Sequence, residues 1–341
     1  MRNLATLPKA HLHVHLESTV RWDTLAEIAT ANGVPVPVSD EGSDEGSDGG
    51  SGGRFAGFRA FADRNSLVRQ CLRRPGDFRR IAREFCAGEA AQGTRYAEVT
   101  FTAAAHGERL GDPAMPLLAV LEGLAEGRAE HGVECRVILD HSRRRSVERA
   151  RRTLGLAVAH AGDGVVGIGV AGEESHSLAP FAEIFREARE AGVRVAHHAG
   201  EMEGPASIRE ALGPGRAERL GHGIRVLDDP DLVAEIRERG VALEVCPSSN
   251  VALGLVPSLA EHPLPRLREA GLTVTLNTDI PTATGATLTD EYARARAAFG
   301  YDDDVMADLA RASVRASFAP PSVQARLEGE IDAWLASAGT P

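Results

Sequence analysis

Eight short runs rich in apolar and β-branched residues recur along the chain, each bounded by residues that favour turns. Amphipathic stretches with helical spacing, such as residues 180–191 and 229–239, separate them. A strand followed by a helix, repeated eight times, predicts a parallel sheet that closes into a (β/α)8 TIM-type barrel, an α/β fold. The runs span residues 11–16, 95–101, 134–139, 165–171, 193–198, 219–222, 241–245 and 272–279.

The alternative to a barrel is an open, doubly wound sheet. No GxGxxG sequence follows the first run, so the phosphate-binding turn of a dinucleotide fold is missing. We therefore expect residues 1–341 to form a single barrel domain, a size that such barrels reach.

Two segments fall outside the strand and helix alternation. Residues 39–53 read SDEGSDEGSDGGSGG and lack any apolar side chain, which predicts a flexible acidic loop inserted into the barrel. Residues 303–341 read as further helices that pack on the outside of the barrel. We assign no function to either segment from the sequence.

The composition excludes several classes of protein. The net charge of −11 disfavours nucleic-acid binding, which needs a basic face. No apolar run is long enough for a signal peptide or a membrane span, so we expect a cytoplasmic protein without membrane contact. The cysteines form no CxxC pair and are expected to be reduced, buried thiols: Cys71, Cys86, Cys135 and Cys246.

Histidines cluster at the end of the first predicted strand, which reads HLHVHLE. His13 and His15 are two residues apart, so on a strand their side chains point to the same face and can bind one metal ion together. His11 shares this parity but lies a layer deeper, where packing or hydrogen bonding is expected.

Further candidate ligands follow later strands. His198 ends the fifth run, Glu201 follows it, His222 ends the sixth run and Asp279 ends the eighth. Active sites of such barrels lie at the carboxyl ends of the strands, and strand 8 neighbours strand 1 when the barrel closes. Three histidines and one aspartate can therefore converge as a site for one Zn²⁺ ion per chain: His13, His15, His198 and Asp279. Zinc lowers the pKa of its bound water towards about 7, which yields a nucleophile near neutral pH.

Several segments, in their order along the chain, resemble the adenosine deaminase family. They are LPKAHLHVHLE, RYAEVTF, VVGIGVAGEE, HHAGE, RLGHG, EVCPSSN, NTDIP and TLTDEY, and they extend from Leu7 to Tyr292. The resemblance implies a zinc-dependent barrel enzyme of the amidohydrolase superfamily that removes an amine from a purine-like ring.

Individual roles also follow from this resemblance. Glu201 would be the general acid that protonates the ring nitrogen next to the attacked carbon, and His222 would orient and deprotonate the zinc-bound water. Gly172 would offer its backbone N–H to the ring, and Glu17 would contact a ribose hydroxyl. A protonated Glu201 requires a pKa raised by burial, and it would neutralise the charge that attack on an amidine-like carbon places on the ring.

One position departs from the family pattern. Two adjacent aspartates usually end strand 8, of which the second contacts the purine N7, but this chain reads NTDIP and has Ile280 there. Isoleucine cannot donate a hydrogen bond, and an unpaired buried acceptor costs about 1–3 kcal/mol. We therefore expect either a purine deaminase of reduced efficiency or a substrate other than adenosine, in which Ile280 contacts the ring.

Three functions remain open at this stage. The first is hydrolytic deamination of a small aminated heterocycle with release of ammonia. The second is a zinc amidohydrolase that opens or cleaves another cyclic C–N bond. The third, a non-catalytic binding protein on the same fold, is disfavoured because all candidate ligands and both acid–base residues are present.

Overall fold

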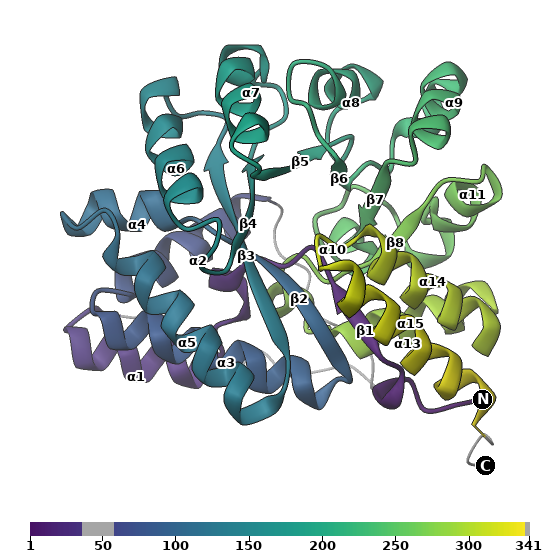
Figure 1. Cartoon of the computed structure of the whole chain (residues 1–341), viewed down its shortest axis with the longest axis horizontal. Coiled ribbons are helices and arrows are strands. Elements are labelled where there is room, and N and C mark those ends of the chain that lie inside the picture. Colours follow the sequence, from purple (N-terminus) through teal and green to yellow (C-terminus); the bar gives the residue numbers. More distant parts are fainter. Residues whose placement is uncertain (36–57, 338–341) are drawn as a thin grey trace.

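The computed structural model describes residues 1–35 and 58–337, in which eight parallel strands form one sheet in the order β1 to β8 (Figure 1). Each strand overlaps one of the predicted runs, and helices surround the sheet, so the predicted (β/α)8 barrel is confirmed. The strands are β1 (Lys9–His11), β2 (Thr94–Phe101), β3 (Glu134–Ser142), β4 (Val165–Ala171), β5 (Arg194–Ala199), β6 (Arg219–His222), β7 (Ala242–Val245) and β8 (Val274–Leu276).

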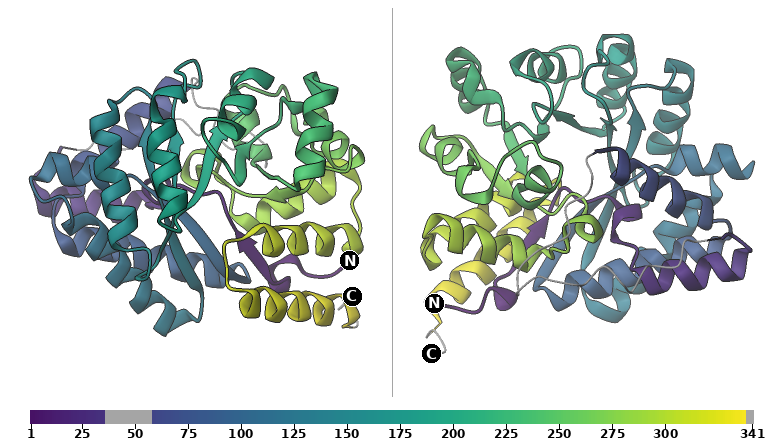
Figure 2. Two further views of the ribbon diagram at one scale, coloured as in Figure 1. Left: turned by 45° about the horizontal axis from the view of Figure 1, so that its top comes forward. Right: turned by 180° about the vertical axis from the view of Figure 1, so that it is seen from behind.

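The helices connect successive strands and cover the outside of the sheet (Figure 2). The described helices are α1 (Trp22–Asn32), α2 (Phe58–Cys71), α3 (Pro75–Ala91), α4 (Ala103–Leu110), α5 (Met115–His131), α6 (Val147–Ala159), α7 (Ala182–Glu190), α8 (Pro205–Leu212), α9 (Pro230–Arg239), α10 (Pro247–Ala252), α11 (Leu264–Glu269), α12 (Pro281–Thr284), α13 (Leu288–Phe299), α14 (Asp303–Ala316) and α15 (Pro321–Ala336). Short 3-10 turns are η1 (Leu4–Thr6), η2 (Leu16–Thr19), η3 (Ala179–Phe181), η4 (Val226–Asp228) and η5 (Leu259–Glu261).

The first strand is shorter than predicted, because β1 ends at His11 and the segment that carries the other two histidines leaves the regular ladder. The Asn277 side chain takes the place of a strand neighbour there, since its Oδ1 accepts the backbone N–H groups of Leu12 (2.8 Å) and His13 (3.1 Å). Val14 forms an isolated parallel bridge with Asp279. The barrel thus closes between its first and last strands through a side chain and a single bridge.

The carboxyl-terminal helices pack against the same seam. α14 contacts β1 and β8, and α15 packs on α14 (Figures 1 and 2). The Arg2 guanidinium donates to the Ser337 carbonyl, which ties the beginning of the chain to the end of α15. The predicted acidic insert at residues 39–53 lies outside the described residues.

Other sequence-based expectations can be examined in the described residues. All four cysteines are free and buried, as expected, although Cys86 and Cys135 bring their sulfur atoms to 3.5 Å. The only lysine, Lys9, is buried and donates to the carbonyls of Leu4 (2.6 Å) and Leu7 (2.8 Å). None of the described helices combines the length and the hydrophobicity needed to cross a bilayer.

Candidate active site

One cavity of about 260 Å³ opens at the carboxyl ends of the strands. Most of the side chains singled out from the sequence line it, and the rest of its wall comes mainly from α2 and from the ends of β2, β3 and β4. His13 lies just beneath and is 3% exposed. The sequence-predicted residues in the lining are His15, Glu17, Gly172, His198, Glu201, His222 and Asp279.

The four predicted metal ligands come together at the bottom of this cavity. Donor atoms of His13, His15, His198 and Asp279 all lie within 4.8 Å of one another. The His15 and His198 Nε2 atoms are 3.1 Å apart, and Asp279 Oδ1 lies 3.3 Å from His15 Nε2 and 3.4 Å from His13 Nε2. The structure therefore offers three nitrogens and one carboxylate oxygen to a single point.

Two of these histidines have their other ring nitrogen engaged. His13 Nδ1 donates to Glu244 Oε2 at 2.8 Å, and His198 Nδ1 donates to the Val170 carbonyl at 3.2 Å. Such contacts fix the tautomer and leave the Nε2 lone pair free to bind a metal. His13 Nε2 is buried without a hydrogen-bond partner among the described residues, which is unusual for a buried polar atom and suits a metal ligand.

The charges of the cluster also favour a bound cation. Burial raises the pKa of Asp279, but the close imidazoles of His13 and His15 hold it well below its ordinary value. Burial lowers the pKa of His13, yet Asp279 and Glu244 on its two sides raise it to about 10. Two buried carboxylates thus flank one imidazole, and a divalent cation satisfies both when it replaces the proton.

The backbone around these ligands is tightly constrained. Asp279 and His222 have positive φ angles of 59° and 65°, a conformation that non-glycine residues rarely adopt. At Gly221 an added Cβ would lie 2.7 Å from His13 Cε1, so only glycine lets the imidazole approach β6. The GHG sequence therefore serves both the packing of His13 and the placement of His222.

Glu201 and His222 stand beside the ligand cluster, with Glu201 Oε1 3.6 Å from His222 Nε2. Burial, together with the nearby Asp279 and Glu174 carboxylates, raises the pKa of Glu201 well above its ordinary value. Burial and the neighbouring His13 lower the pKa of His222 to about 3. The site therefore holds a protonated carboxylic acid next to a neutral imidazole, an acid and a base side by side.

The loop that carries Glu201 is held by a buried carboxylate that sequence reasoning missed. Glu174 accepts the backbone N–H groups of Gly200 (2.7 Å), Glu201 (2.8 Å) and Met202 (2.8 Å), and also the Ser207 hydroxyl (2.6 Å). Four hydrogen bonds to one ionised group fix the loop firmly. Glu174 is the last residue of the AGEE segment, of which only Gly172 is assigned a role from the sequence.

A second set of missed residues comes from the EVCPSSN segment and from the end of η5, which His262 follows directly. The Ser249 hydroxyl donates to Asp279 Oδ2 at 2.6 Å, and Asn250 Nδ2 lies 3.4 Å from Glu201 Oε1. His262 Nε2 donates to Asn250 Oδ1 at 3.2 Å, which sets the orientation of the amide. These contacts position the groups that would perform chemistry without entering the cavity themselves.

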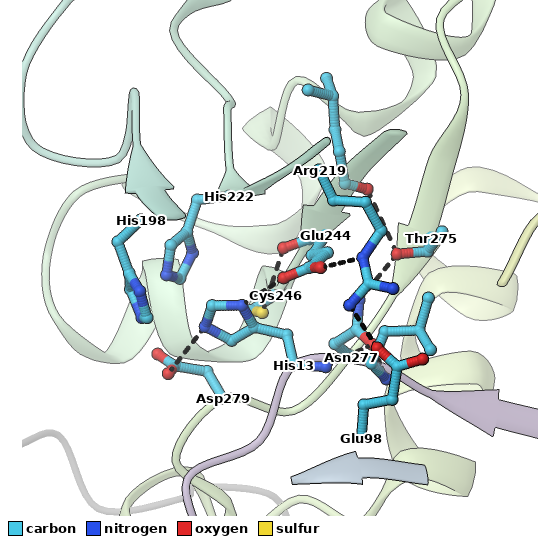
Figure 3. Close-up of polar contacts among 12 residues, drawn as sticks. His13, Glu98, His198, Arg219, His222, Glu244, Cys246, Thr275, Asn277 and Asp279 are labelled. Atoms are coloured by element: carbon cyan, nitrogen blue, oxygen red, sulfur yellow. Dashed lines mark hydrogen bonds and ion pairs between the residues drawn. The ribbon is translucent and has the colours of Figure 1, made fainter. Parts of the chain in front are cut away.

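Behind His13 lies a chain of buried charges (Figure 3). Glu244 accepts from Arg219 Nε at 2.6 Å, and Arg219 donates to Glu98 at 2.5 Å. Glu98 also accepts the Phe318 N–H at 2.5 Å, and the Phe318 ring lies 3.7 Å from the Arg219 guanidinium carbon. The segment between α14 and α15 thus contacts the buried charges that orient a predicted ligand.

The three predicted substrate-binding residues differ in their placement. Glu17 lines the cavity, and its Oε1 accepts from the Thr102 N–H (3.2 Å), from the Thr102 hydroxyl and from His106 (3.2 Å). Gly172 lines the cavity with a φ of 93°. Ile280 is 1% exposed and does not belong to the lining of this cavity, so it lies beside Asp279 without facing the space that the described residues enclose.

Two further histidines lie outside the cavity, and of these His11 is buried as the sequence predicts. His11 is buried below the cluster and contacts Glu89 (3.0 Å) and Thr278 (3.0 Å). His176 is exposed on a loop and approaches Glu173 at 3.9 Å. Neither imidazole lines the cavity.

The chain is similar in sequence to known deaminases. A sequence profile of the family described as adenosine deaminase matches residues 8–334. The chain is 36% identical over 335 residues to a putative adenosine/adenine deaminase of Streptomyces virginiae, and the match covers 98% of each protein.

Solved structures show the same fold. The crystal structure of an adenine deaminase from Arthrobacter aurescens superposes with a TM-score of 0.89 at 31% identity, and the match covers 97% of this chain and all of that one. An amidohydrolase from Burkholderia ambifaria with bound Zn superposes with a TM-score of 0.85 at 25% identity, covering 97% of this chain and 92% of that one.

Proposed function

This chain belongs to the adenosine deaminase family and is a hydrolytic deaminase of aminated heterocycles, and we propose that it works with one zinc ion held by His13, His15, His198 and Asp279. The observation that carries the metal proposal is the buried, unpartnered Nε2 of His13, which points at the three other donors. Three imidazoles and one carboxylate suit zinc better than magnesium or calcium, which prefer oxygen ligands. The Zn-bound relative from Burkholderia ambifaria supports the choice.

Once bound, zinc supplies Lewis acidity that makes water a nucleophile near neutral pH. His222 is neutral and lies next to this position, so it orients the attacking water and accepts its proton. Attack forms a C–O bond at the ring carbon that carries the amine and pushes electron density onto the adjacent ring nitrogen.

Glu201 supplies the proton that this nitrogen needs. Its carboxyl stays protonated because burial raises its pKa, and Asn250 lies within 3.4 Å to hold it in place. When the tetrahedral carbon collapses, the C–N bond to the exocyclic amine breaks. The amine leaves as ammonia after it takes up a proton from the site, and the ring keeps the oxygen as a carbonyl.

We further propose that the substrate is a small aminated heterocycle that differs from adenosine at the edge usually read by a second aspartate. Ile280 takes the place of that second aspartate in the chain and lies buried beside Asp279, so no side chain at this position can form a hydrogen bond with N7. A ring with carbon in place of N7, or a smaller cyclic amidine, would leave no acceptor unpaired there.

The test is ammonia release by the zinc-loaded protein from adenosine, adenine, their 7-deaza analogues and small cyclic amidines, with Ile280→Asp alongside. We expect the wild type to prefer rings that lack N7, and Ile280→Asp to shift the ratio of kcat/KM towards adenosine by about 10- to 100-fold. Efficient turnover of adenosine by the wild type would refute the altered substrate. Release of ammonia from none of these compounds, with metal bound, would refute deamination of this class.

A further inference from the structure

The wall of the cavity away from the metal ligands contains a carboxyl group that the proposed reaction does not use. Asp140 stands near the end of β3, lines the cavity and is 7% exposed. Its Oδ1 is fully buried and has no hydrogen-bond partner among the described residues. A buried carboxylate costs about 1–3 kcal/mol for each unpaired acceptor, and because the Asp140 side chain also lines the cavity, a donor on the ligand can reach its carboxyl group where it borders the cavity.

The charged neighbours of Asp140 do not form that partner. Burial raises its pKa to about 6; His15, Arg69 and Arg145 act in the opposite direction, while Glu17 raises the pKa further. Neither arginine forms an ion pair with Asp140. Arg145 pairs with Glu108 at 3.3 Å instead, and Arg69 makes no ion pair among the described residues. The Asp140 carboxyl group therefore has charged neighbours but no hydrogen-bond donor among the described residues.

Other groups on this wall are also acceptors. Glu17 lines the same cavity, and its three hydrogen bonds all go to Oε1, which leaves Oε2 without a described donor. The Ser142 oxygen lines the cavity two residues beyond Asp140. Arg69 and Arg144 also line the cavity, so this wall offers both acceptors and donors, and the two carboxylates are the groups that would accept a hydrogen bond from a ligand.

We propose that Asp140 is a specificity-determining residue that accepts a hydrogen bond from a hydroxyl or amine group on the substrate, at a position away from the attacked carbon. The proposal rests on the deaminase function above, because it assumes that the reacting ring lies over the metal ligands. It predicts a preference among aminated heterocycles that Ile280 does not determine.

The test measures binding, so it does not depend on turnover. The zinc-loaded Glu201→Gln variant is titrated calorimetrically with two pairs of ligands of matched shape. The first pair is 9-(2-hydroxyethyl)adenine and 9-propyladenine, which differ in a hydroxyl donor. The second is 2,6-diaminopurine and 2-methyladenine, which differ in an amine donor. The pair that shows the larger preference identifies the donor.

With Asp140 present, we expect the donor-bearing member of one pair to bind about 10- to 100-fold more tightly. Asp140→Ala should abolish that preference, and Asp140→Asn, which keeps a neutral acceptor, should retain part of it. The control Asp163→Asn changes an aspartate that is 77% exposed and should leave both pairs unaffected. Circular dichroism and zinc content show whether each variant remains folded and loaded.

Three outcomes would overturn the proposal: neither pair shows a preference, the preference survives in Asp140→Ala, or both members of a pair lose affinity equally. The last result would mean that Asp140 acts only by balancing charge or by holding a buried water. Ammonia release from the same four compounds by the enzyme with Glu201 intact tests the deaminase function separately. A failure there would leave the binding comparison interpretable.

Discussion

The two walls of the cavity are built differently. On the metal side, formed by the ends of β1, β5, β6 and β8, most polar side chains have a partner that fixes their orientation, as Glu244 does for His13 and Ser249 for Asp279. On the opposite side, formed by β3, β4 and α2, Asp140 lacks any hydrogen-bond partner among the described residues and Arg69 has no described ion pair.

The difference separates two requirements of an enzyme. Bond cleavage needs acid, base and metal ligands held within fractions of an ångström before the substrate arrives, and hydrogen bonds behind the ligands supply that rigidity. Recognition of a substrate needs side chains whose hydrogen-bond partners are supplied by the substrate. Side chains without a partner in the protein are therefore expected where the ligand will lie. We therefore infer that the metal side determines the reaction and the opposite side selects the ring.

The largest effect is expected from Asp279→Ala, which would break the metal side directly. The variant removes a ligand and the acceptor of the Ser249 hydroxyl, so zinc content and ammonia release should fall together to background. Elemental analysis and an ammonia assay on the same sample check this. Wild-type activity with the metal retained would show that Asp279 is not a ligand.

Glu201→Gln should separate metal binding from proton transfer. The amide keeps the shape of the side chain but cannot donate an acidic proton, so zinc content should stay at the wild-type level while kcat falls by about 10²–10⁴-fold. Zinc analysis and steady-state kinetics measure the two quantities. If Glu201→Gln kept a rate near that of the wild type, the acid role proposed for this residue would be wrong.

A smaller effect should follow from Glu244→Gln, which weakens the hydrogen bond that orients His13 but leaves all four predicted metal ligands in place. His13 would keep a neutral acceptor, but the charge between His13 and Arg219 would be lost, so zinc affinity should fall by about 10- to 100-fold. Competition with a chelator measures this. The control Glu130→Gln changes a half-exposed carboxylate on α5 and should bind zinc normally. Equal affinities in both variants would mean that the metal side does not depend on its buried charges.

The strand pattern and the candidate ligands could be predicted because they are local in sequence. Alternating apolar runs specify strands, and the HxH, HHAGE, GHG and NTD segments place histidines and carboxylates at their ends. The exact length of β1 could not be predicted, since the Asn277 side chain replaces the ladder after His11. A local sequence pattern cannot predict that the side chain of Asn277, 265 residues away, accepts the backbone N–H of Leu12.

The sequence by itself determined the fold class and the set of side chains available for chemistry, because both depend on periodicity and on residue type at strand ends. Only the tertiary structure decided which of these side chains are held and which are left unpaired. Glu174, Glu244 and Arg219 form their positioning contacts with residues distant in the chain, whereas Asp140 Oδ1 is buried without a partner among the described residues. Folding of the barrel brings these groups together and buries them. Burial and the new neighbours then determine their hydrogen bonds and pKa values, which the sequence alone does not specify.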